Sequence, residues 1–60
     1  SIGNLIFRQG KKWYTPDTPL LRGTQREILL QEGKIQERTI FQEDVVNFDE
    51  IKIINAMNTL

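Results

Sequence analysis

The segment from Leu20 to Glu27 holds the residues whose types and order point most directly to chemistry. Thr24 and Glu27 have the spacing of a capping box, in which each side chain bonds a backbone N–H that the first helical turn leaves free. A helix is therefore expected to begin here, directly after Gly23. Free N–H groups and the helix dipole favour phosphate or carboxylate, and Arg22 adds a positive charge. The segment predicts an anion site, although a glycine before a capped helix is more often only a turn.

The remaining polar residues give weaker signals. The chain contains no histidine and no cysteine, so it lacks the commonest general base and the thiolate metal ligands. The acidic pairs 43–44 and 49–50 could bind a metal or exchange protons, but adjacent side chains do not converge on one point. Capping and solubility are the expected roles of these carboxylates, and Arg26 is expected to pair with a carboxylate. We therefore predict no catalytic residue and no metal site in this chain.

Length and charge restrict the class of protein. Sixty residues can build only one small core, and eight basic and eight acidic residues are interspersed. A basic aromatic group could bind single-stranded nucleic acid, but zero net charge favours aromatic residues in the core or at a partner. No apolar run reaches membrane-spanning length and no signal pattern opens the chain, so we predict a cytoplasmic protein that binds neither membrane nor nucleic acid. That basic aromatic group consists of Arg8, Lys11, Lys12, Trp13 and Tyr14.

The hydrophobic pattern predicts a mixed α/β (α+β) fold with the order β-β-α-β-α-β. Gly10 suits a hairpin turn, two prolines make 15–19 a rigid loop, and Gly33 suits the end of a helix that turns Ile28, Leu29 and Leu30 inward. Ile35 should anchor the third strand at a sheet edge. The expected elements are strands at 4–8 and 12–14, a helix at 25–32, an edge strand at 34–39, a short amphipathic helix at 41–48 and a buried strand at 51–54.

Both ends of the chain look cut, so residues 1–60 are expected to form a single partial domain. Ser1 opens almost directly onto a strand, and the residues after Ile54 form a small polar turn where a covering helix would be typical. The sheet should then be covered on one side only. An uncovered apolar face favours association with the missing parts of a longer protein or with a second copy.

Five stretches, in order along nearly the whole chain, resemble a known family. Together they are similar to the C-terminal region of class IV aminotransferases, which are fold type IV enzymes that use pyridoxal 5'-phosphate. Arg22-Gly23 and Asn55-Ala56 are most similar to the aminodeoxychorismate lyases among them. The stretches are Gly3-Asn4-Leu5-Ile6-Phe7, Tyr14-Thr15-Pro16, Leu20-Leu21-Arg22-Gly23-Thr24-Gln25-Arg26, Ile35-Gln36-Glu37 and Phe48-Asp49-Glu50-Ile51-Lys52-Ile53-Ile54-Asn55-Ala56.

The resemblance implies a set of cofactor-binding residues. The turn that includes Gly23 would give donors to the cofactor phosphate, and the Asn55-Ala56 turn would add phosphate and substrate contacts. The family often has a hydroxyl residue where Gln25 stands, and an amide differs from it in reach and rigidity. The implied cofactor-binding residues are Arg22, Gly23, Thr24, Gln25, Asn55 and Ala56.

The resemblance also implies that this chain does not act alone. The family's Schiff-base lysine and the carboxylate that pairs with the pyridine nitrogen lie upstream of the Asn4 motif. The lysines of this chain therefore read as solvated surface residues. We expect the isolated chain to be inactive, to bind no cofactor tightly, and to require the remainder of a parent enzyme, which is expected to be a homo-oligomer. These lysines are Lys11, Lys12, Lys34 and Lys52.

Two readings of the function stay open. The first is a fragment of an enzyme that either transaminates an amino acid or eliminates pyruvate from aminodeoxychorismate. The second is a small interaction module without enzymatic activity, in which Phe7, Trp13 and Tyr14 of the hairpin dock a protein partner.

Overall fold

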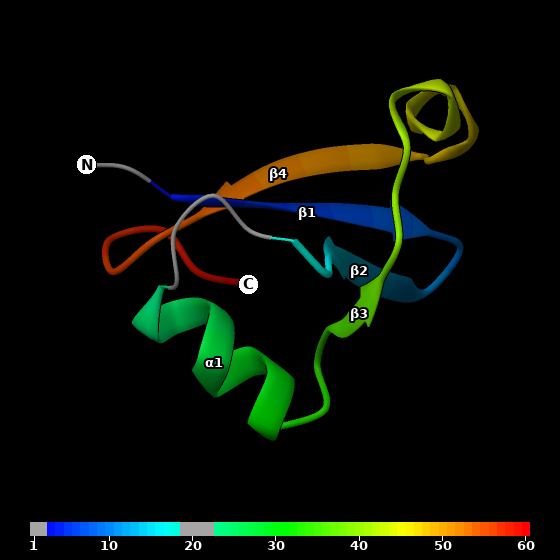
Figure 1. Cartoon of the computed structure of the whole chain (residues 1–60). Helices are drawn as coiled ribbons and strands as arrows, with labels where there is room; N and C mark the ends of the chain where they lie inside the picture. Colours follow the sequence, from blue (N-terminus) through cyan, green and yellow to red (C-terminus); the bar gives the residue numbers. More distant parts are fainter. Residues whose placement is uncertain (1–2, 19–22) are drawn as a thin grey trace.

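A four-stranded sheet with the strand order β3-β2-β1-β4 forms the body of the molecule, and helix α1 covers one of its faces (Figure 1). The computed structural model describes residues 3–18 and 23–60. The predicted mixed α/β fold and the order of six elements are confirmed. The elements are β1 (Asn4–Gln9), β2 (Lys12–Pro16), α1 (Thr24–Gln31), β3 (Gln36–Arg38), the 3-10 helix η1 (Gln42–Asn47) and β4 (Glu50–Ile54).

Strands β1 and β2 form the predicted antiparallel hairpin, in which Phe7 lies opposite Tyr14. Gly10 has a φ of 63° in the turn, a conformation that costs glycine little. The prediction that 15–19 is entirely loop is wrong, because β2 continues through Thr15 and Pro16. The hydroxyl of Thr15 donates to the Leu5 carbonyl oxygen at 3.0 Å, and the proline ends the strand, where its missing N–H does little harm.

Helix α1 ends as the glycine predicts. Gly33 has a φ of 73°, and the N–H of Lys34 donates to the Leu29 carbonyl oxygen at 2.9 Å. Of the three apolar residues expected to face inward, only Leu29 is fully buried, Leu30 is half-buried, and Ile28 is 41% exposed. An eight-residue helix on a small sheet therefore has only a narrow apolar stripe in contact with the core.

The closed core lies between α1 and the sheet. Ile6 of β1, Leu29 of α1 and Ile54 of β4 form one buried cluster, which also includes Ile35 immediately before β3. Strand β3 pairs with β2 in parallel and lies at the edge of the sheet, as predicted, with all three of its residues exposed. Ile35 rather than the strand itself thus anchors this edge to the core.

Strand β4 pairs antiparallel with β1 and forms the opposite edge of the sheet. The prediction of a buried strand is wrong for most of its length, because Ile51 and Ile53 are 48% and 52% exposed and only Ile54 is buried. Side chains alternate between the two faces of a strand, and the described residues leave the part of this face that carries Ile51 and Ile53 largely uncovered. Leu5, opposite Ile53 in the register, is also 44% exposed.

The second predicted helix is the 3-10 helix η1, which leads into β4. Asp44 accepts a hydrogen bond from the N–H of Phe41 at 2.9 Å and so caps its start. After η1, the ring of Phe48 lies 5.2 Å from that of Phe7 and 6.3 Å from that of Tyr14, measured between centroids. This aromatic cluster covers one part of the face opposite α1. Within 3–18 and 23–60, no helix is long and apolar enough to cross a membrane.

Candidate functional site

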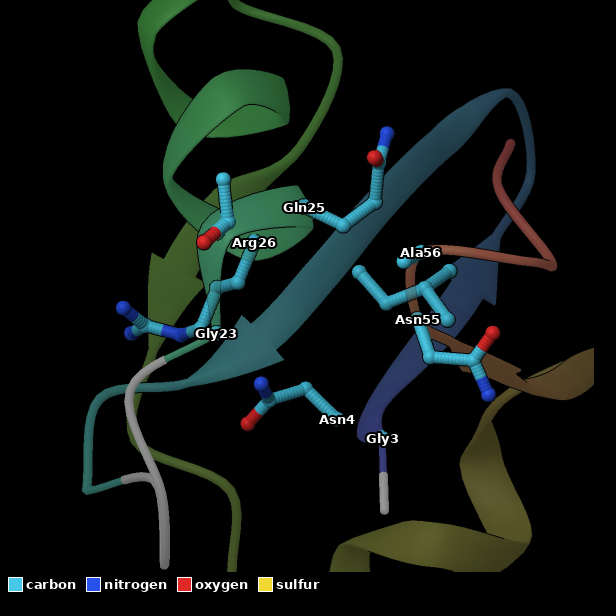
Figure 2. Close-up of a pocket in the computed structure, with 9 residues that line it drawn as sticks. Gly3, Asn4, Gly23, Gln25, Arg26, Asn55 and Ala56 are labelled. Atoms are coloured by element: carbon cyan, nitrogen blue, oxygen red, sulfur yellow. The ribbon is translucent and has the colours of Figure 1, made fainter. Parts of the chain in front are cut away.

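A pocket of about 250 Å³ lies where the N-terminus of α1 meets the start of β1 and the turn after β4 (Figure 2). Three segments that are far apart in the sequence therefore supply its walls. The lining residues are Gly3, Asn4, Gly23, Thr24, Gln25, Arg26, Ile54, Asn55 and Ala56.

The N-terminus of α1 is not capped by a side chain. Gly23, with φ −109° and ψ 141°, is the N-cap, and its carbonyl oxygen accepts the first helical hydrogen bond from Glu27 at 3.1 Å. The predicted capping box is therefore wrong: Thr24 is already the first helical residue, and the Glu27 carboxylate lies 3.5 Å from the Arg26 guanidinium. Since glycine has no side chain to accept these hydrogen bonds, the first-turn N–H groups stay available to a ligand.

Gly23 has backbone angles that any residue can adopt, but its lack of a side chain makes room for a neighbour. A Cβ at this position would lie 2.7 Å from the side-chain nitrogen of Asn4. The amide of Asn4, from the start of β1, thus lies against the helix N-terminus. A larger residue at position 23 would push this amide aside and fill the entrance to the first helical turn.

The turn after β4 forms the opposite wall. The backbone N–H and carbonyl groups of Asn55 and Asn58 bond each other at 2.8 and 3.2 Å, and the Asn55 side-chain oxygen accepts from the Met57 N–H at 2.9 Å. With its oxygen held in this way, the Asn55 amide points away from Gly23 and Asn4 (Figure 2). Ala56 follows at the exposed tip of the turn.

The side chain of Gln25 does not point toward Gly23 and Asn4 (Figure 2). Its amide nitrogen donates to the hydroxyl of Thr59, because the segment after β4 folds back toward α1. The prediction that Gln25 replaces a hydroxyl donor is therefore not supported for its side chain. Its contribution to the pocket is that of its backbone in the first helical turn.

Arg26 is the buried charge of the site, with 3% of its surface exposed. Its Nη2 donates to a carboxylate oxygen of Glu37 at 2.6 Å and to the carbonyl oxygen of Pro16 at 3.2 Å. The predicted pairing with a carboxylate is confirmed. Its Nε is buried and has no hydrogen-bond partner among the described residues, although the residue lines the pocket.

The structure brings five of the six predicted cofactor-binding residues to this pocket, namely Gly23, Thr24, Gln25, Asn55 and Ala56. The sixth, Arg22, lies outside the described residues. Sequence reasoning did not assign Gly3, Asn4, Arg26 or Ile54 to the site. Gly3 carried a readable signal, since a glycine at the start of a strand often marks a close approach: a Cβ there would clash with the Ile54 carbonyl oxygen.

The family model for amino-transferase class IV matches residues 1–60, the whole chain. The chain belongs to the class IV aminotransferase family. A crystal structure of a candidate 4-amino-4-deoxychorismate lyase from Haemophilus somnus 129PT has 61% sequence identity and a TM-score of 0.95 over 98% of this chain. The predicted resemblance to the lyase-like members of the class IV family is thereby confirmed.

An uncharacterized protein of Haemophilus influenzae strain Rd is 93% identical over all 60 residues. This chain spans 32% of that protein and 30% of the solved H. somnus chain. The class IV segment described here therefore corresponds to about a third of the length of the proteins that it matches.

The other candidate groups have structural partners. Asp49 accepts a hydrogen bond from the Gly10 N–H at 2.8 Å and Glu50 pairs with Arg8 at 3.0 Å, so this acidic pair stabilises the hairpin turn. No group of three potential metal ligands occurs within the described part of the chain. Three of the four lysines are exposed as expected, whereas Lys52 is half-buried and donates to the Thr59 carbonyl oxygen at 3.3 Å.

Proposed function

We propose that this chain is the phosphate-binding part of a pyridoxal phosphate-dependent class IV enzyme, which acts as an aminotransferase or as a 4-amino-4-deoxychorismate lyase. The observation that carries the proposal is the uncapped N-terminus of α1 at the wall of a pocket. Class IV membership supports the cofactor, and the H. somnus structure supports the lyase reaction.

The residues present fit a phosphate group. The first-turn N–H groups of α1 have no side-chain cap, and Gly23 leaves open the space that a Cβ would fill. The amide of Asn4 lies beside this space, and the buried guanidinium of Arg26 adds positive charge behind the first turn. Backbone donors at a helix N-terminus combined with a nearby cation are typical of phosphate sites.

When bound, pyridoxal phosphate would supply an electron-withdrawing ring that stabilises negative charge on the substrate. The residues of this chain would hold and orient it. The N–H groups of Thr24 and Gln25 would bind the phosphate, the Asn55-Ala56 turn would add contacts from the opposite wall, and Gly23 would allow the close approach. We propose no catalytic residue in this segment, so the isolated chain should be inactive and should hold the cofactor only weakly.

Gly23→Val in a full-length protein that contains this segment tests the proposal. The branched side chain should displace the Asn4 amide and block the helix N-terminus, and so raise the dissociation constant for the cofactor by about tenfold or more, equivalent to about 1.4 kcal/mol, with a matching loss of occupancy at limiting cofactor. Gln31→Val is the control, because it places the same branched side chain at an exposed position at the other end of α1, outside the pocket. Occupancy is read from the visible absorbance of the purified protein, and folding from circular dichroism. A folded Gly23→Val protein with normal occupancy would place the phosphate elsewhere.

We also propose a partner for the uncovered face of the sheet. Leu5, Ile51 and Ile53 are each about half exposed there, and the relatives contain twice as much further sequence as this chain. The remainder of the parent enzyme is the proposed occupant, and the whole enzyme is proposed to be a cytoplasmic homo-oligomer without nucleic-acid or membrane binding.

The alternative of an interaction module that uses hairpin aromatic residues has less support. Phe7 is 4% exposed under Phe48, and Trp13 packs against the buried cluster. The surface that could contact a partner is aliphatic and belongs to β1 and β4. This arrangement suits packing within a larger protein better than the predicted aromatic docking site.

A further inference from the structure

The first turn of α1 has no apolar anchor. Its residues Thr24, Gln25, Arg26 and Glu27 are all polar, and the only apolar side chain of α1 that is fully buried is Leu29, in the second half of the helix. Some other interaction must therefore fix the end of the helix that lines the pocket. Arg26 is the only residue of this turn that is buried.

The guanidinium of Arg26 connects three elements. It belongs to α1, and its Nη2 bonds both the Pro16 carbonyl oxygen at the end of β2 and the Glu37 carboxylate in β3. Removing both partners of a buried arginine strongly destabilises a protein, so these hydrogen bonds hold the Arg26 side chain in one orientation. The rigid fork of the guanidinium also restricts the orientation of the helix more tightly than an ammonium group would.

We infer that Arg26 is a positioning residue for the anion site: it holds the first-turn N–H groups of α1 in place through Pro16 and Glu37. This inference rests on the proposed function. The Nε of Arg26 is also buried, and among the described residues it has no hydrogen-bond partner. An anion in the pocket would compensate for this donor electrostatically, while the Nη2 hydrogen bonds keep the helix in register with the sheet.

A positioning role and a purely electrostatic role predict opposite effects at Glu37. If Arg26 acted only through its charge, removing the carboxylate of Glu37 would leave more positive potential at the pocket and would strengthen anion binding. If Arg26 acts by holding the helix, removing the carboxylate loosens the helix N-terminus and weakens anion binding. The side chain of Glu37 is 50% exposed, and glutamine keeps an oxygen that can accept from Arg26, so Glu37→Gln is expected to weaken this contact without unfolding the protein.

The experiment uses a full-length protein that contains this segment, with pyridoxal phosphate and its phosphate-free analogue pyridoxal as the two probes. The dissociation constant for pyridoxal divided by that for pyridoxal phosphate isolates the contribution of the phosphate group. We expect Arg26→Lys to reduce this ratio by about tenfold and Glu37→Gln to reduce it several-fold, as losses of supporting hydrogen bonds commonly do. Pyridoxal affinity should change by less than about twofold, since the ring contacts lie elsewhere.

Arg38→Gln is the control, because it removes one positive charge from the residue next to Glu37 while Arg38 itself lies over the Tyr14 and Phe48 rings. It should leave the ratio unchanged. Thermal unfolding by circular dichroism checks that each variant is folded. If Arg26→Lys fails to fold, the direction of the change in the ratio for Glu37→Gln alone decides between the two roles.

The outcomes separate the two proposals. A wild-type protein that binds pyridoxal phosphate no better than pyridoxal would contradict the proposed phosphate site itself. A wild-type preference that both variants retain would overturn only the positioning role of Arg26. A stronger preference in Glu37→Gln would also overturn it, in favour of a purely electrostatic role.

Discussion

The two faces of the sheet differ in how well the residues of this chain cover them. On the face covered by α1, Ile6, Ile54, Leu29 and the neighbouring Ile35 are at most 2% exposed. On the other face, Phe48 covers Phe7, but the aliphatic side chains nearer the pocket end of β1 and β4 remain about half exposed. The first face thus has its own core and carries the candidate site at its border, whereas the second face is a surface that needs a partner.

The largest expected effect contrasts neighbouring residues of β1 that belong to opposite faces. Ile6→Ala should lower the free energy of unfolding of the 60-residue chain by about 2–5 kcal/mol, because it leaves a cavity in a closed core. Leu5→Ala should cost about 1 kcal/mol or less, because Leu5 is already 44% exposed. Urea unfolding followed by circular dichroism measures both values.

The same pair tests what covers the open face. In a full-length protein the cost of Leu5→Ala should rise toward that of Ile6→Ala, since the remainder of the enzyme would then bury Leu5. An equal cost of Leu5→Ala in the short chain and the long protein would show that the face stays exposed in both.

An intermediate effect is expected for association of the isolated chain through its open face. Ile53→Lys should raise the dissociation constant for self-association by about tenfold or more, because it places a charge in the exposed aliphatic patch at an edge strand. Val46→Lys in η1 is the matched control, since Val46 is 85% exposed and lies outside the sheet. Sedimentation velocity over a range of concentrations gives the result. A wild-type chain that stays monomeric throughout would contradict the proposed association.

The smallest effect concerns the site itself. The isolated chain should retain weak affinity for inorganic phosphate or sulfate, with a solvated helix terminus contributing about 0.3–1 kcal/mol for a favourable charge. In an NMR titration the amide signals of Thr24, Gln25 and Asn55 should shift, while those of Leu5 and Ile53 on the open face should not. Shifts spread evenly over both faces would indicate non-specific binding.

Local sequence signals predicted the turns better than the packing. Gly10 and Gly33 marked the hairpin turn and the helix end because positive φ is a local requirement. The β-branched run in β4 predicted a strand correctly, but its burial depends on whichever element covers each face, which a short pattern does not contain. The capping box failed for a similar reason, since both Gly23 and Thr24 suit an N-cap and the contact with Asn4 is long-range.

The location of the candidate site could be predicted from the sequence, but the hydrogen bonds that hold its helix in place could not. The turn at Gly23 and the Asn55-Ala56 turn followed from family resemblance and do line one pocket. Predicting the Arg26 contacts with Pro16 and Glu37 requires knowing which strands are neighbours. β2 and β3 pair in parallel, and α1 connects them along the chain. Such pairing is set by the fold as a whole.

The pairing of β1 with β4 also determines when the pocket can exist. Asn4 lies opposite Ile54, so the two pocket walls next to these residues meet only after about fifty intervening residues are in place. During synthesis on the ribosome, the nascent chain must extend past Ala56 before this strand pair can form, and closing so long a loop is slow. Under the proposed function, the cofactor phosphate could therefore bind only after this segment has been translated completely. A prematurely terminated polypeptide would lack the second wall of the pocket.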